Sequence, residues 1–236
     1  MATKSEKMKR KLILFDIDGT LIKGCKVHDD SFSEGIRKVY GIEASKDEIE
    51  SAGKTDKRII IELLNKKGVP KEKICSNIKK VYDVMITYCK KNIKSDSSVK
   101  VMPNVKKLLI LLKERGHILG LLTGNLREIA KLKMKKTGLV NFFKVGSFGE
   151  ESEKRSELVK KAIKVAEKKY KIKFKKDDVF IVGNTPLDVE CGKESGVKTI
   201  AIAAGPYSIK KLKEHSPDFL FKDFSNINLI IKSIEN

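Results

Sequence analysis

Two aspartates lie directly after an apolar segment near the beginning of the chain. In the stretch "LILFDIDGTL", Asp16 and Asp18 stand two positions apart after Leu12–Phe15. Because alternate residues of an extended chain point the same way, both carboxylates can face one space, where their mutual repulsion favours a nearby cation. Mg²⁺ suits such a place, since it prefers oxygen ligands and often shares phosphate oxygens. The plainer alternative is a turn in which Gly19 takes a positive φ.

A candidate anion-binding loop follows a second apolar segment. The residues "LGLL" end before Thr123, Gly124 and Asn125, and an amphipathic stretch begins at residue 126. The hydroxyl of Thr123 and the free amides at a helix N-terminus can bind an anion. Asn125 is also a favourable N-cap residue, and the two interpretations are compatible.

Two later segments add a cation and further oxygen atoms. In "GEESEKRSELVKK", Lys154 and Arg155 fall in the first turn of a predicted helix, where they oppose the helix dipole unless an anion compensates them. The glutamates within residues 150–153 offer the same compensation, so this segment alone favours neither interpretation. In "VFIVGNTPLDVE", Asn184 and Asp188 follow an apolar strand and could complete the coordination of a metal.

Short apolar segments alternate with amphipathic ones along most of the chain. Strands are predicted at 11–15, 117–122, 142–148, 179–183, 199–204 and 218–221, and helices at 103–115, 126–137, 153–170 and 187–195. Apolar strands separated by helices are typical of an α/β fold with a doubly wound parallel sheet. In such a sheet, ligands bind beyond the carboxyl ends of the strands, which is where the polar residues above fall.

One region interrupts this alternation. Residues 22–101 contain helical patterns but no clear buried strand, which predicts an all-helical domain inserted after the first strand. The core would then comprise residues 11–21 and 102–236, and the basic residues 1–10 would form a flexible tail.

The composition is that of a folded globular protein with a strongly basic surface. The 236 residues carry a formal net charge of +20, and 40% are hydrophobic. Lysines are interleaved with glutamates along the predicted helices, so a solvated surface explains the charge better than a nucleic-acid partner, and a bias toward anionic small molecules also fits. No segment reaches the roughly 18–20 apolar residues of a membrane span. The four cysteines lack metal-ligand spacing, which predicts free thiols and a cytoplasmic location.

The combined pattern DxDGT…TG…K/R…GNxxxD resembles the haloacid dehalogenase superfamily, which includes phosphatases with an aspartate nucleophile. The resemblance covers the chain from Lys11 onward, and "DIDGTL" is its most specific part. It implies a Rossmann-like core with a helical cap inserted after the first motif, as in members similar to phosphoglycolate phosphatase.

The resemblance also implies a role for each motif. Asp16 is expected to attack phosphorus and form an aspartyl-phosphate, and Asp18 to act as general acid and then general base. Thr123, backbone amides and a basic residue are expected to stabilise the charge on the phosphoryl oxygens. Arg155 is the preferred basic residue, with Lys154 as the alternative.

Mg²⁺ is the cofactor that the resemblance implies. Its expected ligands are Asp16, the backbone carbonyl of Asp18, Asn184 and Asp188. The family usually has aspartate where this chain has Asn184, and an amide brings no negative charge, so weaker Mg²⁺ binding or slower turnover is expected. The expected substrate-binding residues are Gly19, Thr20, Gly124 and Asn125 and, from the cap, Lys54, Thr55 and Arg58, although Thr55 could equally be an ordinary helix cap.

These features predict a Mg²⁺-dependent phosphomonoester hydrolase that acts on a small phosphorylated metabolite, of the phosphoglycolate or sugar phosphate class, as a monomer or homodimer. A phosphomutase of the same family is one alternative. A nucleic-acid-binding or regulatory protein on a weakly active hydrolase scaffold is another, suggested by the net charge and by Asn184. The histidines His28, His117 and His215 have no neighbours at ligand spacing and are expected to pack in the core or lie at the surface.

Overall fold

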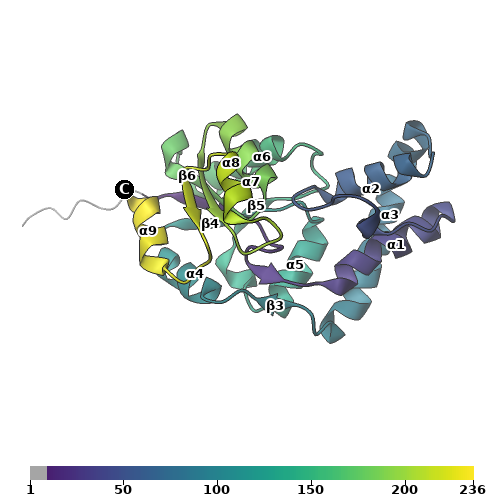
Figure 1. Cartoon of the computed structure of the whole chain (residues 1–236), viewed down its shortest axis with the longest axis horizontal. Coiled ribbons are helices and arrows are strands. Elements are labelled where there is room, and N and C mark those ends of the chain that lie inside the picture. Colours follow the sequence, from purple (N-terminus) through teal and green to yellow (C-terminus); the bar gives the residue numbers. More distant parts are fainter. Residues whose placement is uncertain (1–9) are drawn as a thin grey trace, which may run out of the picture.

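A parallel sheet flanked by helices forms most of the computed structural model, which describes residues 10–236 (Figure 1). Six strands lie in the order β5 (Val145–Ser147), β4 (Ile118–Leu122), β1 (Leu12–Phe15), β6 (Val179–Gly183), β7 (Lys198–Ile202) and β8 (Phe219–Phe221). Every neighbouring pair runs parallel. The predicted α/β fold with a doubly wound parallel sheet is therefore confirmed.

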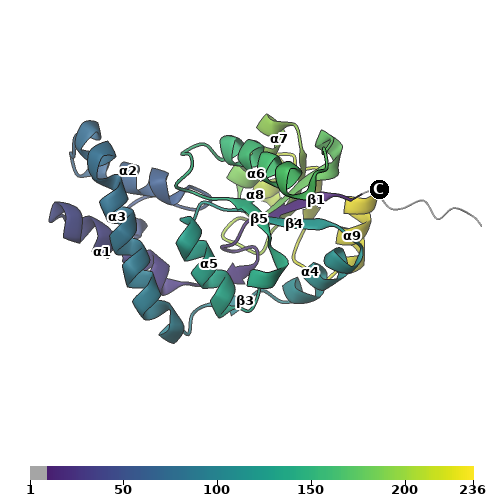
Figure 2. The ribbon, with the colours of Figure 1, turned by 180° about the vertical axis from the view of Figure 1, so that it is seen from behind.

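Helices cover both faces of the sheet (Figures 1 and 2). One face carries α4 (Val105–Glu114), α5 (Arg127–Lys136) and α9 (Ile227–Glu235), and the other carries α6 (Arg155–Tyr170) and α7 (Pro186–Ser195), while the short α8 (Ile209–Glu214) packs near β8. In β1, Ile13 and Phe15 pack toward the first face, and Leu12 and Leu14 toward the second. All four are fully buried, so the two aspartates that follow are fixed to a rigid central strand.

Three helices form a separate unit beside the sheet (Figure 1). They are α1 (Lys26–Tyr40), α2 (Asp56–Lys66) and α3 (Lys71–Asn92). Phe32, Leu63 and Met85 belong to their own apolar cluster, which Leu126 and Ile129 at the beginning of α5 extend into the core. We call α1–α3 and the loops between them the three-helix unit, and its independence as a domain stays a prediction.

Two short strands pair where the chain enters and leaves the three-helix unit. They are β2 (Ile22–Lys23) and β3 (Lys100–Val101), which run antiparallel. The sequence pattern predicted no strand in this region, because two residues are too few to show the alternation by which a strand is recognised.

Other boundaries differ from the prediction for local reasons. Asn125 does not cap α5, because Leu126 occupies the N-cap position and the Asn125 side chain bonds to Asp18 instead. Lys154 is the N-cap residue of α6, and the Ser152 hydroxyl accepts a hydrogen bond from its backbone N–H. Single-turn 3-10 helices occur at Lys46–Glu48, Ile93–Ser95, Val140–Phe142 and Lys176–Asp178. The 3-10 helix at Val140–Phe142 overlaps the strand predicted at 142–148, so the observed strand β5 is shorter than predicted.

Three further predictions concern the cysteines, membrane-spanning segments and the N-terminal tail. The four cysteines are free, as predicted. Among the described residues, no helix is both long and apolar enough to cross a membrane. The basic tail predicted at residues 1–10 lies almost entirely outside the described residues.

Asp96 ties the two connections of the three-helix unit together. Helix α1 begins after Cys25, which offers no side-chain cap. Oδ2 of Asp96 accepts a hydrogen bond from Val27 N (2.9 Å), and Oδ1 accepts one from Ser98 N (2.9 Å). Burial raises the pKa of this carboxyl, but the hydrogen bonds from Ser98 and Val27 outweigh it, so the net direction is downward. Asp96 thus acts as a helix cap supplied from the returning segment.

We expect Asp96→Ala to lower the free energy of unfolding by about 1 kcal/mol at pH 7, the usual contribution of a capping side chain. Because the pKa is lowered, this contribution is complete above the ordinary aspartate pKa of about 3.9 and is lost as pH falls through the lower pKa of the folded state. Urea denaturation over a series of pH values measures the loss, with Asp83→Ala, at an exposed position on α3, as the control. A loss that does not shrink at low pH would contradict this role.

Candidate active site

Asp16 and Asp18 open onto a cavity of about 240 Å³ at the carboxyl ends of the strands. The core contributes Gly19, Gly124, Asn125, Arg155, Asn184, Thr185 and Pro206 to its lining, and the three-helix unit and its loops contribute His28, Lys46, residues 51–54, Asp56 and Ile59. The cavity therefore lies between the core and the three-helix unit, at the edge where parallel sheets bind ligands.

Arg155 joins two of the predicted acidic residues. Its Nη2 lies 3.3 Å from Oδ1 of Asp16 and also donates to Oδ1 of Asp188, and Nη1 donates to the carbonyl of Gly53 (3.1 Å). The Arg155 side chain is only 5% exposed, so these contacts fix the guanidinium in place. Lys154 is exposed, so the structure brings Arg155, rather than Lys154, to Asp16.

Asp16 lies in an environment that opposes its charge. The side chain belongs to a residue only 7% exposed. Burial and then the negative charge of Asp188 raise the pKa of Asp16 to about 8, in spite of the opposing effect of Arg155. A further cation beside Asp16 would stabilise the ionised carboxylate.

Asn184 and Asp188 are held by the turn that begins α7. Thr185 and Asp188 form a capping box, in which Oδ2 of Asp188 accepts hydrogen bonds from the Thr185 backbone N–H and hydroxyl (3.0 and 2.7 Å). Asn184 accepts a hydrogen bond through Oδ1 from the hydroxyl of Thr20 (2.9 Å). A Cβ on Gly19 would lie 2.3 Å from Asn184 Nδ2, so only glycine fits there. Thr20 is fully buried and does not line the cavity, so its contact with the site is through Asn184.

The loop after β4 lines part of the cavity and contacts the three-helix unit. Thr123 is fully buried, and its hydroxyl accepts a hydrogen bond from Asn125 N (3.2 Å). The carbonyl of Gly124 accepts one from Asp56 N (2.7 Å), and a Cβ at Gly124 would lie 2.2 Å from the carbonyl oxygen of Lys54. Gly124 and Asn125 line the cavity, whereas Thr123 does not.

Of the three cap residues predicted to bind substrate, only Lys54 lines the cavity. Lys54 pairs with Glu62 (2.6 Å). Thr55 is the N-cap of α2 and accepts a hydrogen bond from Arg58 N, as its plainer interpretation predicted. Arg58 pairs with Glu62 (2.8 Å) and lines a neighbouring cavity of about 250 Å³ together with Lys154.

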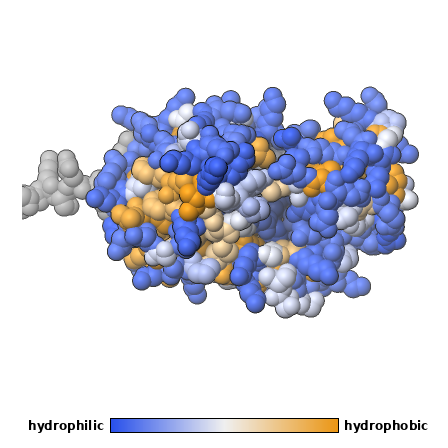
Figure 3. All heavy atoms as spheres, in the orientation of Figure 1, coloured by the Kyte–Doolittle hydropathy of each residue, from blue (hydrophilic) through white to orange (hydrophobic). Residues whose placement is uncertain are grey.

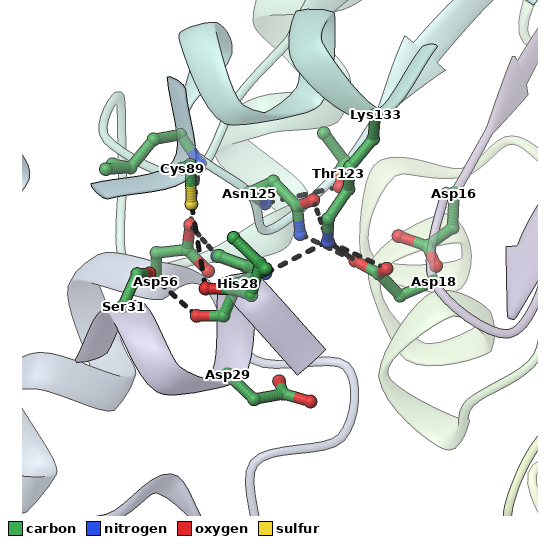
Figure 4. A network of polar contacts seen from close by, with 12 residues as sticks. Asp16, Asp18, His28, Asp29, Ser31, Asp56, Cys89, Thr123, Asn125 and Lys133 are labelled. Carbon is green, nitrogen blue, oxygen red and sulfur yellow. Dashed lines mark hydrogen bonds and ion pairs between the residues drawn. The ribbon is translucent and has the colours of Figure 1, made fainter. Parts of the chain in front are cut away.

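The sequence interpretation missed a second buried cation, Lys133 on α5 (Figure 4). Its Nζ lies 2.8 Å from each carboxylate oxygen of Asp18, 2.7 Å from Oδ1 of Asn125 and 2.9 Å from Nδ1 of His28. Burial acts to raise the pKa of Asp18, but the Lys133 ammonium outweighs it and lowers the value to about 2. A signal was present, because Lys133 lies four residues after the buried Ile129 on the same helix face.

The three histidines differ in their surroundings. His28 is buried and its ring packs against Phe32, as expected of a packing residue. It also lies in the polar network with Lys133, which the sequence interpretation did not predict. His117 is buried near Glu235 (3.3 Å), and His215 lies near Glu190 (3.0 Å). These two are packing and surface residues, as expected.

The donor atoms of the site fit a hard divalent cation. Within residues 10–236, no group of three or more His, Cys, Asp or Glu side chains could hold a metal by itself. The carboxylate of Asp16, the carbonyl of Asp18, the amide oxygen of Asn184 and the carboxylate of Asp188 are all oxygen donors, which Mg²⁺ prefers. The ammonium and guanidinium of Lys133 and Arg155 face the carboxylates of Asp16, Asp18 and Asp188, which leaves negative charge for a cation to balance.

Comparison with known proteins agrees with this fold and site. A sequence model described as "Haloacid dehalogenase-like hydrolase" matches residues 13–202, so the chain belongs to the haloacid dehalogenase-like hydrolase family. It is an enzyme of the hydrolase class, and its relatives are phosphatases.

Relatives of similar length carry two different names. The chain is 26% identical over 224 residues to the pyrophosphatase PpaX of Anoxybacillus flavithermus, covering 93% of this chain and 95% of that one. It is 25% identical over 230 residues to the phosphoglycolate phosphatase of Aquifex aeolicus, covering 96% and 97%. The crystal structure of a predicted phosphatase from Clostridium acetobutylicum has the same fold, with a TM-score of 0.72, 20% identity and coverage of 94% and 99%.

We expect Asp16→Asn to stabilise the protein in the presence of a chelator, because it removes one of two buried carboxylates that oppose each other's charge. The expected gain is about 2 kcal/mol, or a rise of ~4–8 °C in melting temperature. Mg²⁺ should raise the melting temperature of the native chain but not that of the variant. Thermal unfolding with EDTA and with Mg²⁺ measures both effects, and an equal response of the two proteins to Mg²⁺ would contradict the expectation.

Proposed function

We propose that the protein is a Mg²⁺-dependent phosphatase that hydrolyses a small phosphorylated metabolite through a phosphorylated Asp16. The observation that carries this proposal is the position of Asp16 at the mouth of a small cavity, beside the guanidinium of Arg155 and two residues from a second carboxylate. Membership of a hydrolase family with phosphatase relatives supports the reaction class.

The first step transfers the phosphoryl group to Asp16. Asp18 is ionised in the ligand-free protein, so it first takes up a proton as the anionic substrate binds beside it. A carboxylate oxygen of Asp16 then attacks phosphorus, the bond from phosphorus to the leaving oxygen breaks, and Asp18 gives that oxygen the proton. Arg155 and the backbone N–H of Gly124, which lines the cavity, stabilise charge on the transferred group. The contact between the Arg155 guanidinium and Asp16 supports this role, because it holds a positive charge beside the attacking oxygen.

The second step returns the enzyme to its starting form. Asp18, now ionised, takes a proton from a water molecule as that water attacks phosphorus, and the bond between phosphorus and Asp16 breaks. Inorganic phosphate is released. The lowered pKa of Asp18 suits the ionised form that accepts this proton.

Mg²⁺ would be held by Asp16, the carbonyl of Asp18, Asn184 and Asp188, and would supply positive charge beside the phosphoryl oxygens. Asn184 brings one negative charge fewer than an aspartate would. Asp188 uses one oxygen for the capping box and the other for Arg155, so its share of the binding is mostly electrostatic.

The three-helix unit is proposed to act as a cap that excludes water from the cavity. At about 240 Å³, the cavity is smaller than the roughly 300–1,000 Å³ typical of larger ligands, so the substrate is small. Lys46 and Lys54 line it from the cap side, where they pair with Asp29 (2.7 Å) and Glu62 (2.6 Å). A substrate with a second anionic group beyond the reacting phosphate would compete with these carboxylates for the two lysines. Phosphoglycolate and pyrophosphate both have this character.

A phosphatase panel with and without Mg²⁺ tests the proposal. The panel should contain phosphoglycolate, pyrophosphate, sugar monophosphates and p-nitrophenyl phosphate, with phosphate release as the readout. We expect Mg²⁺-dependent turnover of at least one substrate and a loss of about a thousandfold or more in Asp16→Asn, since removing a nucleophile has effects of this size or larger.

Other outcomes separate the alternatives. Isomerisation of a sugar phosphate without phosphate release would identify a phosphomutase. No turnover of any substrate, together with a salt-sensitive mobility shift of duplex or RNA, would favour a nucleic-acid-binding protein.

We expect Asn184→Asp to tighten Mg²⁺ binding, because it adds a carboxylate beside Asp16 without a change in size. Titration of the Mg²⁺ dependence of the melting temperature measures the change, which should be at least about tenfold in Kd, since even changes to the residues around metal ligands alter affinity by about 10- to 100-fold. In EDTA the variant should melt at a lower temperature than the native chain, since it adds a buried charge. Unchanged or weaker Mg²⁺ binding would count against Asn184 as a ligand.

A further inference from the structure

The ammonium of Lys133 is fully buried, although no step described above uses it. Its acceptors are both carboxylate oxygens of Asp18, the amide oxygen of Asn125 and Nδ1 of His28. Burying an ammonium without acceptors costs several kcal/mol. These contacts therefore fix the end of an otherwise flexible side chain, and Figure 4 shows it directed at Asp18.

The contacts also define the tautomer of His28. An ammonium can only donate hydrogen bonds, so Nδ1 of His28 accepts and the ring proton lies on Nε2. Nε2 then donates to Oδ2 of Asp56 (3.1 Å). Oδ2 of Asp56 also accepts a hydrogen bond from Leu126 N (2.7 Å). The series Asp56–His28–Lys133–Asp18 thus has a donor opposite an acceptor at every contact.

This series of contacts crosses between the three-helix unit and the core. His28 is on α1 and Asp56 is at the beginning of α2, whereas Lys133 is on α5 and Leu126 is the N-cap of that helix. The contact between His28 and Lys133 and the contact between Asp56 and Leu126 therefore both depend on the three-helix unit lying against the core. Movement of this unit away from the core would leave Lys133 with Asp18 and Asn125 alone.

Lys133 reaches the reacting atoms only through Asp18. Asp18, Asn125 and His28 line the cavity, whereas Lys133 does not. The Asp18 side chain is 40% exposed. Its Oδ2 accepts hydrogen bonds from both Lys133 and Asn125, whereas Oδ1 accepts one from Lys133 and keeps a second lone pair for proton transfer.

We propose that Lys133 is a positioning residue through which the three-helix unit fixes the Asp18 carboxylate when it closes over the substrate. The inference rests on the proposed function only in that Asp18 carries protons in the reaction. It makes His28 the residue that links the position of the cap to the position of the acid–base group.

Kinetics of p-nitrophenyl phosphate hydrolysis with Mg²⁺ test the proposal in Lys133→Met, His28→Phe and the double variant. Lys133→Met should lower kcat by about 10- to 100-fold, part of the 10²–10⁴ that general acid–base catalysis contributes. Because Lys133 does not line the cavity, the inhibition constant of inorganic phosphate should stay within about twofold, less than the loss of even one direct hydrogen bond would give. Lys135→Met, at an exposed position on the same helix, is the control and should match the native chain.

The double variant shows whether His28 acts through Lys133. His28→Phe keeps a ring beside Phe32 but offers no acceptor, and it should lower kcat by about 3- to 10-fold, roughly the 0.7–1.4 kcal/mol of one hydrogen bond. In the Lys133→Met background it should lower kcat no further. Losses that simply multiply would overturn the link between the two residues.

Two further results would overturn the proposal. One is a kcat for Lys133→Met within twofold of the native value. The other is a phosphate inhibition constant that rises in step with the fall in kcat, which would make Lys133 a phosphate-binding residue. If Lys133→Met does not fold, His28→Phe decides alone, and a native kcat in that variant contradicts the proposal. A native chain inactive on every substrate would instead remove the proposed function.

Discussion

The contact of Arg155 with Asp16 and Asp188 is the interaction on which the rest of the site depends. Two carboxylates buried this close together oppose each other's ionisation, and a guanidinium between them makes the arrangement tolerable. It also joins the end of β1 to the beginnings of α6 and α7. The same contact therefore holds these elements together and positions the acidic residues of the site. Because β1 and β6 are neighbours in the sheet, the short distance from Asp16 to Asp188 follows from the strand order.

Two cations divide the acidic residues into different environments. Arg155 forms ion pairs with Asp16 and Asp188, whereas Lys133 forms one with Asp18. The side chains alone keep Asp18 ionised and raise the pKa of Asp16. These directions are the reverse of what the first step needs, because Asp16 attacks as a carboxylate and Asp18 gives a proton. A cation beside Asp16 and the phosphate of the substrate beside Asp18 would shift the two pKa values toward the required forms. The three-helix unit contributes to the environment of Asp18, because His28, which contacts Lys133, and its partner Asp56 both belong to this unit.

The sequence predicted the parallel sheet and the motifs better than their surroundings. Six apolar segments and the spacing of Asp16 and Asp18 are local signals, and the strands and the cavity lie where those signals indicated. Lys133 was missed because two of its partners, Asp18 and His28, lie 115 and 105 residues earlier in the chain. The inward position of Thr123 could not be predicted either, because it depends on how the loop after β4 folds. The pairing of Arg58 with Glu62 joins residues four apart on α2, so its spacing was a local signal that the sequence interpretation did not use.

The most direct test of the account is a search for phosphate on the enzyme. Native protein and Asp18→Asn should each be mixed with Mg²⁺ and a substrate that the native protein hydrolyses. The reactions are then quenched in acid and examined by peptide mass spectrometry. The account predicts a phosphoryl group on the peptide that contains Asp16, accumulating more in Asp18→Asn, because the proton acceptor for the second step is missing there. A protein that turns over substrate yet carries phosphate on another residue, or on none in either form, would contradict it.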